Sequence, residues 1–78
     1  MANYIVHNVT TNTRQTCAAE DDAWTLIDPQ DAGRAPWLGP DDRWELLCLR
    51  NSLIYVLAWG TGPCHKDDWI RDHRLAPR

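Results

Sequence analysis

The feature that most restricts the fold is an unbroken apolar run, Leu53-Ile54-Tyr55-Val56-Leu57-Ala58-Trp59. It is rich in β-branched and aromatic residues, which favour strands, and Gly60 and Gly62 end it. We predict a strand over 52–59 that is buried on both faces, because a strand in the interior of a sheet is apolar throughout. A helix that continues through residue 59 is the alternative, since periodicity does not decide a short all-apolar run.

The length of the chain limits the core that surrounds such a strand. Its 78 residues form one domain, 1–78, and a domain this short buries only about 60% of the surface of its unfolded chain. Five Trp and no Phe make tryptophan the main large core residue. Trp24, Trp44 and Trp59 stand within apolar patterns and are expected in the core. Trp37 stands in a Pro/Gly loop and is expected at the surface, and Trp69 fits either place.

The N-terminal third predicts a hairpin followed by a helix. Residues 3–9 are β-rich and alternate, 10–13 are polar and turn-prone, and 14–19 suit a return strand. The acids of Glu20-Asp21-Asp22 then precede an apolar stretch, and acids favour the first turn of a helix because the N–H groups there are unpaired. We predict a helix over 21–28 that Pro29 ends.

Two further helices are predicted, over 40–50 and over 66–74. Pro40-Asp41-Asp42 is typical of a helix start, and Trp44, Leu47 and Cys48 follow with helical spacing. In the tail, Asp67 and Arg71 form a helical i,i+4 pair, although an alternating strand is also possible. The predicted fold class is α+β. It has a small antiparallel sheet of about three strands (3–9, 14–19 and 52–59) packed against two or three short helices.

Cysteine and histidine residues are the candidates for catalysis or metal binding. Cys48, Cys64, His65 and His73 are zinc-binding types, but no C-x2-C or H-x3-5-H spacing joins them. No G-x-S-x-G loop supports a nucleophile, and G-T-G-P at 60–63 lacks the lysine of a phosphate loop. We therefore expect no enzymatic activity, no cofactor and no metal site. A Cys/His-based enzyme or zinc module is the alternative.

The charge of the chain points to a basic partner. A net charge of -3 and a pI near 5.4 disfavour direct binding to nucleic acid or to an anionic membrane. No apolar run approaches the roughly 20 residues that span a bilayer. The N-terminus shows no secretory signal and the three cysteines are unpaired in number, so we expect reduced thiols and a cytoplasmic location.

Protein binding is the function that the composition favours. Trp and Arg are enriched in interface hot spots and Lys and Glu are depleted, and this chain has five Trp and seven Arg against one Lys and two Glu. The Pro/Gly loop within 31–42 is the first candidate surface, and the start of the tail helix is the second. The predicted partner-binding residues are Asp31, Trp37, Asp41, Asp42, Asp67, Asp68 and Trp69.

Residues 3–28 resemble small proteins of phages and other mobile elements, in particular anti-CRISPR inhibitors. The shared outline is two strands and a helix that opens with acids, here Thr16-Cys17-Ala18-Ala19-Glu20-Asp21-Asp22-Ala23-Trp24. The resemblance implies a non-enzymatic inhibitor, a monomer or homodimer in the cytoplasm of a host cell. It would block a nucleic-acid-binding surface of a larger protein or ribonucleoprotein. A small structural or assembly subunit that self-associates is the alternative.

Overall fold

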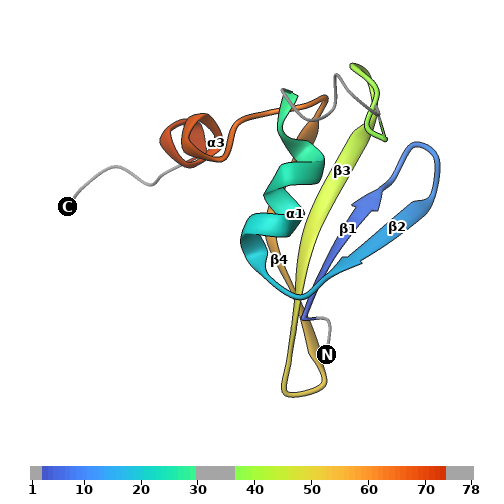
Figure 1. Ribbon diagram of the computed structural model, residues 1–78, viewed down its shortest axis with the longest axis vertical. Helices are drawn as coiled ribbons and strands as arrows, with labels where there is room; N and C mark the ends of the chain where they lie inside the picture. The colour runs from blue at the N-terminus through green and yellow to red at the C-terminus, as the bar shows by residue number, and fades with distance from the viewer. Residues whose placement is uncertain (1–2, 30–36, 74–78) are drawn as a thin grey trace.

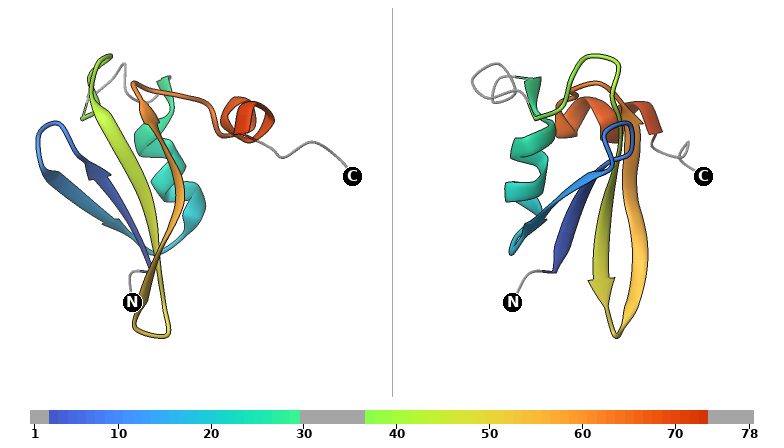
Figure 2. Two further views of the ribbon diagram at one scale, coloured as in Figure 1. Left: turned by 180° about the vertical axis from the view of Figure 1, so that it is seen from behind. Right: turned by 90° about the vertical axis from the view of Figure 1, so that its right-hand side faces the viewer.

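The structure, a computed structural model, describes residues 3–29 and 37–73, which form an α+β fold as predicted. Four antiparallel strands make one sheet in the order β2-β1-β3-β4 (Figure 1), one strand more than expected. Helix α1 packs on one face of this sheet, and α3 lies beyond its β4 edge (Figures 1 and 2). In chain order the elements are β1 (Tyr4–Asn8), β2 (Thr13–Cys17), α1 (Glu20–Ile27), β3 (Arg43–Arg50), β4 (Leu53–Thr61) and α3 (Lys66–His73).

The first hairpin and both acid-led helices agree with the sequence. Strands β1 and β2 pair from Tyr4 opposite Cys17 to Asn8 opposite Thr13. Helix α1 carries its three acids in the first turn, and α3 carries Asp67 and Asp68 there. None of the helices within 3–29 and 37–73 is long and apolar enough to cross a membrane.

The helix predicted over 40–50 is wrong, because this segment contains strand β3. Burial alternates with a period of two: Trp44, Leu46 and Cys48 are buried and face α1, while the residues between them are less buried. The Pro-Asp-Asp signal forms a turn instead of a helix start. Asp42 accepts a hydrogen bond from the Gly39 N–H (2.8 Å), and its own N–H donates to the Gly39 carbonyl (3.1 Å). Leu46 lies opposite Val6 in β1, so long-range pairing with β1 makes this segment a strand instead of a helix.

Strand β4 is present as predicted, but its expected burial on both faces is wrong. It pairs only with β3 in the described part of the chain and forms an edge of the sheet. Ala58 is buried, whereas the large side chains of β4 remain between 38% and 61% exposed. Trp59, expected in the core, is 53% exposed. The apolar composition predicted a strand correctly, but it did not predict whether that strand lies in the interior or at the edge of the sheet.

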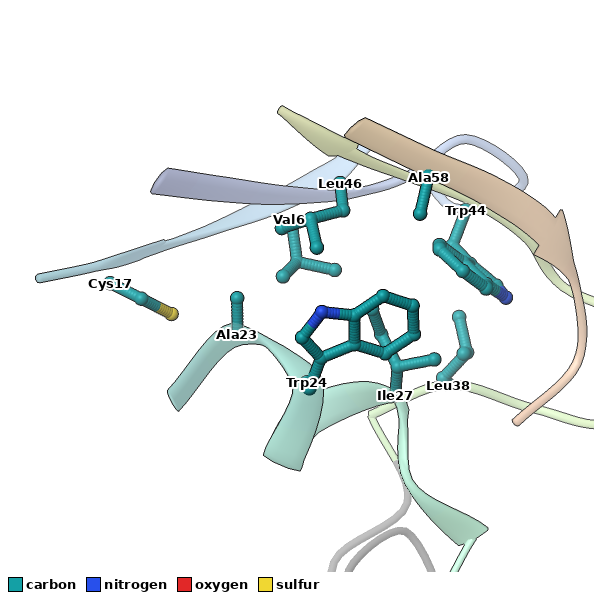
Figure 3. Close-up of a cluster of buried hydrophobic side chains, with 9 residues drawn as sticks. All are labelled: Val6, Cys17, Ala23, Trp24, Ile27, Leu38, Trp44, Leu46 and Ala58. Carbon is teal, nitrogen blue, oxygen red and sulfur yellow. The ribbon is translucent and has the colours of Figure 1, made fainter. Parts of the chain in front are cut away.

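The core lies between α1 and the sheet (Figure 3). Trp24 and Trp44 are buried there as predicted, with ring centroids 5.9 Å apart in an edge-to-face arrangement. Their indole N–H groups also have partners, because Trp24 donates to the Glu20 carboxylate (3.1 Å) and Trp44 to the Gly62 carbonyl (2.8 Å). The cluster consists of Val6, Cys17, Ala23, Trp24, Ile27, Leu38, Trp44, Leu46 and Ala58.

The face of the sheet opposite α1, here called the open face, has no described helix over it (Figure 2). Residues opposite each other in an antiparallel pair share a face, so the strand register assigns Ile5, Leu47 and Val56 to one row across it. Trp59 and Glu45 form a second pair on the same face. Aliphatic and aromatic side chains therefore extend from the open face to the exposed edge at β4.

Candidate protein-binding site

Three aromatic side chains gather where the end of β4 meets α3. The rings of Trp69 and His73 stack with centroids 4.2 Å apart and planes 13° apart. Trp59 meets Trp69 edge-to-face at 5.4 Å and His73 at 5.5 Å. Trp59 and His73 are exposed and Trp69 is half-buried, so this aromatic cluster presents ring surface to solvent.

Hydrogen bonds to the backbone hold the aromatic cluster in place. The indole N–H of Trp69 donates to the Trp59 carbonyl at 2.7 Å, which ties α3 to the edge of the sheet. Nδ1 of His73 donates to the Trp69 carbonyl at 3.0 Å, one helical turn earlier. Trp69 also lies 6.1 Å from Trp24, centroid to centroid, so the cluster is joined to the core. A site with fixed side chains loses less conformational entropy when it binds a partner.

The helices beside this cluster carry most of the negative charge. Within 20–28 and 66–73, seven acids and two bases leave a net charge of -5, whereas the remaining described residues have three acids and three Arg. Lys66 Nζ lies 3.7 Å from carboxylate oxygens of both Glu20 and Asp21, so the Lys66 side chain links the start of α3 to the first turn of α1. Arg71 pairs with Asp68. The acids are Glu20, Asp21, Asp22, Asp28, Asp67, Asp68 and Asp72.

The predicted partner-binding residues divide between two places. Asp67, Asp68 and Trp69 lie together in the first turns of α3, next to Trp59 and His73. Trp37, Asp41 and Asp42 lie in the segment before β3, and Asp31 falls outside the described residues.

The segment before β3 is tied to the fold. Trp37, expected at the surface, is half-buried against the core, and its carbonyl accepts a hydrogen bond from the buried Asn8 amide (3.2 Å). The same amide donates to Asp42 Oδ2 at 3.0 Å. The hydrogen bonds from Asn8 and Gly39 lower the pKa of the Asp42 carboxyl from its ordinary value of 3.8. Asp41 is exposed. Two of the three residues here therefore have a structural role.

The cysteines and histidines are the side chains that the sequence offered for catalysis or metal binding. No three His, Cys, Asp or Glu side chains within 3–29 and 37–73 are placed to hold a metal ion. Burial raises the pKa of Cys17 and of Cys64, and nearby carboxylates raise both further. A raised pKa favours the thiol, which is a weaker nucleophile than the thiolate. His65 Nδ1 contacts Asp28 Oδ2 at 2.9 Å, which connects the start of α3 to the end of α1.

Sequence reasoning missed Trp59 and His73 as site residues. Trp59 was assigned to the core because it ends an apolar run, and nothing local shows that the run is an edge strand. His73 had a usable signal, because Trp69 and His73 are four residues apart and such residues share a helix face. Comparisons with protein families, with curated proteins and with solved structures found no match to this chain.

Proposed function

We propose that this chain is a non-enzymatic inhibitor that binds a basic surface of a larger protein or ribonucleoprotein. The observation that carries the proposal is the exposed aromatic cluster of Trp59, Trp69 and His73 beside the acids of α3. The nucleic-acid-binding groove of a CRISPR effector complex is the target surface that the resemblance of residues 3–28 suggests. A protein bound there would exclude the nucleic acid without any chemical step.

The cluster suits a partner rich in Arg and Lys for two physical reasons. The face of a tryptophan ring attracts a cation, by about 0.5–1 kcal/mol at exposed sites and by more once water is excluded. Carboxylates such as Asp67 and Asp72 add a longer-range attraction that guides encounter and is screened by salt. A groove that binds nucleic acid displays the same cations to phosphates.

A direct test measures whether the protein displaces nucleic acid from an effector. A panel of purified CRISPR effector complexes is titrated with the protein, and binding of labelled target DNA is followed by mobility shift. We expect at least one complex to lose DNA binding, with a lower half-inhibitory concentration at about 50 mM salt than at about 300 mM, because exposed charge pairs are screened. Retention of DNA binding by every complex would refute the inhibitory role.

Variants locate the surface on the responsive complex. Trp59→Ala removes a side chain that is 53% exposed, so the fold tolerates it, and a hot-spot residue loses about 2 kcal/mol or roughly thirtyfold in affinity. Asp67→Asn with Asp72→Asn tests the charges of α3. Asp41→Asn is the matched control, an exposed acid on the segment before β3. Equal inhibition by wild type and Trp59→Ala, with loss in the control, would place the site on that segment instead.

A self-associating subunit is the second candidate, and the exposed apolar edge at β4 is the observation that favours it.

A further inference from the structure

Strand β4 is an edge strand that lacks most of the features that normally prevent edge-to-edge pairing, and its one irregularity is a register shift against β3 that leaves Leu57 as an extra residue. Natural edge strands are protected by charged residues, proline, short length or a covering element. β4 has nine residues, Leu-Ile-Tyr-Val-Leu-Ala-Trp-Gly-Thr, with no charge and no proline. The opposite edge of the sheet differs, because β2 reads Thr-Arg-Gln-Thr-Cys and exposes polar side chains. The two edges are therefore not equivalent, and only β4 is apolar.

The hairpin geometry shows which backbone groups of β4 face outward. Asn51 and Ser52 both have positive φ (53° and 64°), as in a two-residue type I′ turn. In such a hairpin the flanking pair, Arg50 and Leu53, is hydrogen-bonded, and the pattern alternates along the strands. The N–H and C=O groups of Tyr55 therefore point to β3, whereas those of Ile54 and Val56 point away from the sheet.

Helix α3 limits the length of the available edge. The Trp59 carbonyl already accepts the indole N–H of Trp69, so α3 covers the edge from that residue onward. The uncovered part extends from Leu53 to Leu57, and its central residue is Tyr55. The β3–β4 hairpin reaches past the first turn of α1 (Figure 1), so the described elements leave this part open.

We infer that a second copy of this chain pairs with β4 in antiparallel orientation, about a two-fold axis at Tyr55. Ile54 then lies opposite Val56 of the partner copy, and each such pair exchanges both of its N–H···O=C bonds. The two four-stranded sheets become one sheet of eight strands. The row formed by Ile5, Leu47 and Val56 on the open face continues into Ile54 of the partner copy, and the two Tyr55 side chains meet on the other face.

Area and charge both support a second copy as the occupant. The five residues of 53–57 are about half exposed. At about 200 Å² for each large apolar residue, they offer roughly 1,000 Å² over two copies, near the minimum for a specific interface. They also project from both faces of the sheet, and a paired strand places side-chain neighbours beside them on both faces. The two-fold axis further brings the hairpin end of each copy, with the exposed Arg50, towards the acidic α3 of its partner.

The first test follows self-association and backbone protection together. Analytical ultracentrifugation from about 5 to about 500 μM brackets a micromolar Kd, which suits an interface of this size. We expect a monomer–dimer equilibrium. Amide hydrogen exchange at the two ends of this range is expected to slow for Ile54 and Val56 only at the high concentration. Tyr55 exchanges slowly at both, because its N–H pairs with β3.

Two variants test the register. Val56→Lys changes a half-exposed residue and is expected to abolish the dimer, and Gln15→Lys on the exposed β2 edge is the matched control that retains it. In a Cys48→Ser, Cys64→Ser background, which removes the thiol opposite Tyr55 on β3, Tyr55→Cys places two thiols across the axis at about 4.5 Å between Cα atoms, within disulfide range. Oxidation is then expected to yield a covalent dimer, and Thr16→Cys on β2 is expected to yield none.

The inference is independent of the inhibitor function, which the DNA-displacement assay tests separately. A monomer at all concentrations would overturn it and leave the edge to a strand from another protein. A dimer with unprotected Ile54 and Val56 amides, or with no crosslink from Tyr55→Cys, would overturn the proposed pairing.

Discussion

Asn8 joins three parts of the fold, and its removal gives the sharpest test of how they are held together. Its side chain is fully buried (0% exposed) on the face of the sheet that α1 covers. The amide group donates to the Trp37 carbonyl at 3.2 Å and to Asp42 Oδ2 at 3.0 Å. The amide oxygen accepts the Thr11 N–H at 3.2 Å, which closes the β1–β2 turn. One residue therefore connects strand β1 to its turn and to the segment before β3.

The expected cost of Asn8→Ala follows from these three bonds. A neutral hydrogen bond contributes about 1 kcal/mol and a bond to a charged group about 1.5–3 kcal/mol, so two neutral bonds and one charged bond sum to about 3.5–5 kcal/mol. With a urea m-value of about 1 kcal/mol/M for so small a protein, the unfolding midpoint falls by about 3.5–5 M. Asn3→Ala, at an exposed asparagine outside the sheet, is the matched control and is expected to change stability by less than about 0.5 kcal/mol.

A double-mutant cycle isolates the free-energy contribution of the hydrogen bond between the Asn8 amide and the charged Asp42 carboxylate. Asn8→Ala, Asp42→Ala and the double variant are unfolded in urea at neutral pH. We expect a coupling energy of about 1.5 kcal/mol between the two side chains, in the range of contacting residues. A total loss below about 1 kcal/mol for Asn8→Ala would refute the reasoning, since it would mean that water replaces these bonds at little cost. A coupling energy near zero would refute the assignment of a stabilising hydrogen bond to the Asn8–Asp42 pair.

Three further outcomes follow from the structure. The lowered pKa of Asp42 stabilises the fold above pH about 3.8, and this contribution disappears as the pH falls through the folded-state pKa. In urea unfolding from pH 2.5 to 6, the free energy of unfolding should therefore fall less steeply with acid in Asp42→Asn than in wild type. Parallel plots of this free energy against pH would contradict the prediction. Gly62 has φ +76°, and an added Cβ would lie 2.6 Å from the Pro40 carbonyl oxygen. Gly62→Ala should cost about 2–4 kcal/mol by thermal melting, and an unchanged Tm would contradict the strain. Because the pKa values of Cys17 and Cys64 are raised, disulfide-exchange reagents at pH 7.5 should modify both at least about tenfold more slowly in the folded protein than in urea. Equal rates would contradict the burial.

The three double-acid signals show how far local sequence information reaches. Glu20-Asp21-Asp22 and Asp67-Asp68 were predicted as helix starts, and both occupy the first turn of a helix. Asp41-Asp42 carries the same local signal and precedes a strand. The difference comes from Asn8, which lies 34 residues earlier and binds the Asp42 carboxylate in a turn. A hydrogen-bond partner that is 34 residues away cannot be predicted from the residues around Asp41-Asp42.

The candidate site was predicted only where a helix defined it. Asp67, Asp68 and Trp69 were named because acids and a tryptophan begin a predicted helix, and the structure places them beside two other aromatic rings. Trp37 was named because no periodic pattern buried it, yet it packs against the core from an irregular segment. Burial in a loop depends on which surface the loop meets, and that surface consists of strands far away in the sequence.

The burial of β4 is the instructive disagreement between sequence and structure. A strand that is apolar on both faces is typical of the interior of a sheet, where both neighbours and both faces are covered. β4 has this composition and occupies an edge, with Ile54 as its most exposed large residue at 61%. Exposed apolar area of this extent is rare on monomers and marks interaction surfaces. Pairing of two copies would give β4 a strand neighbour on each side, which is one of the two conditions that its composition favours and which the single chain does not supply.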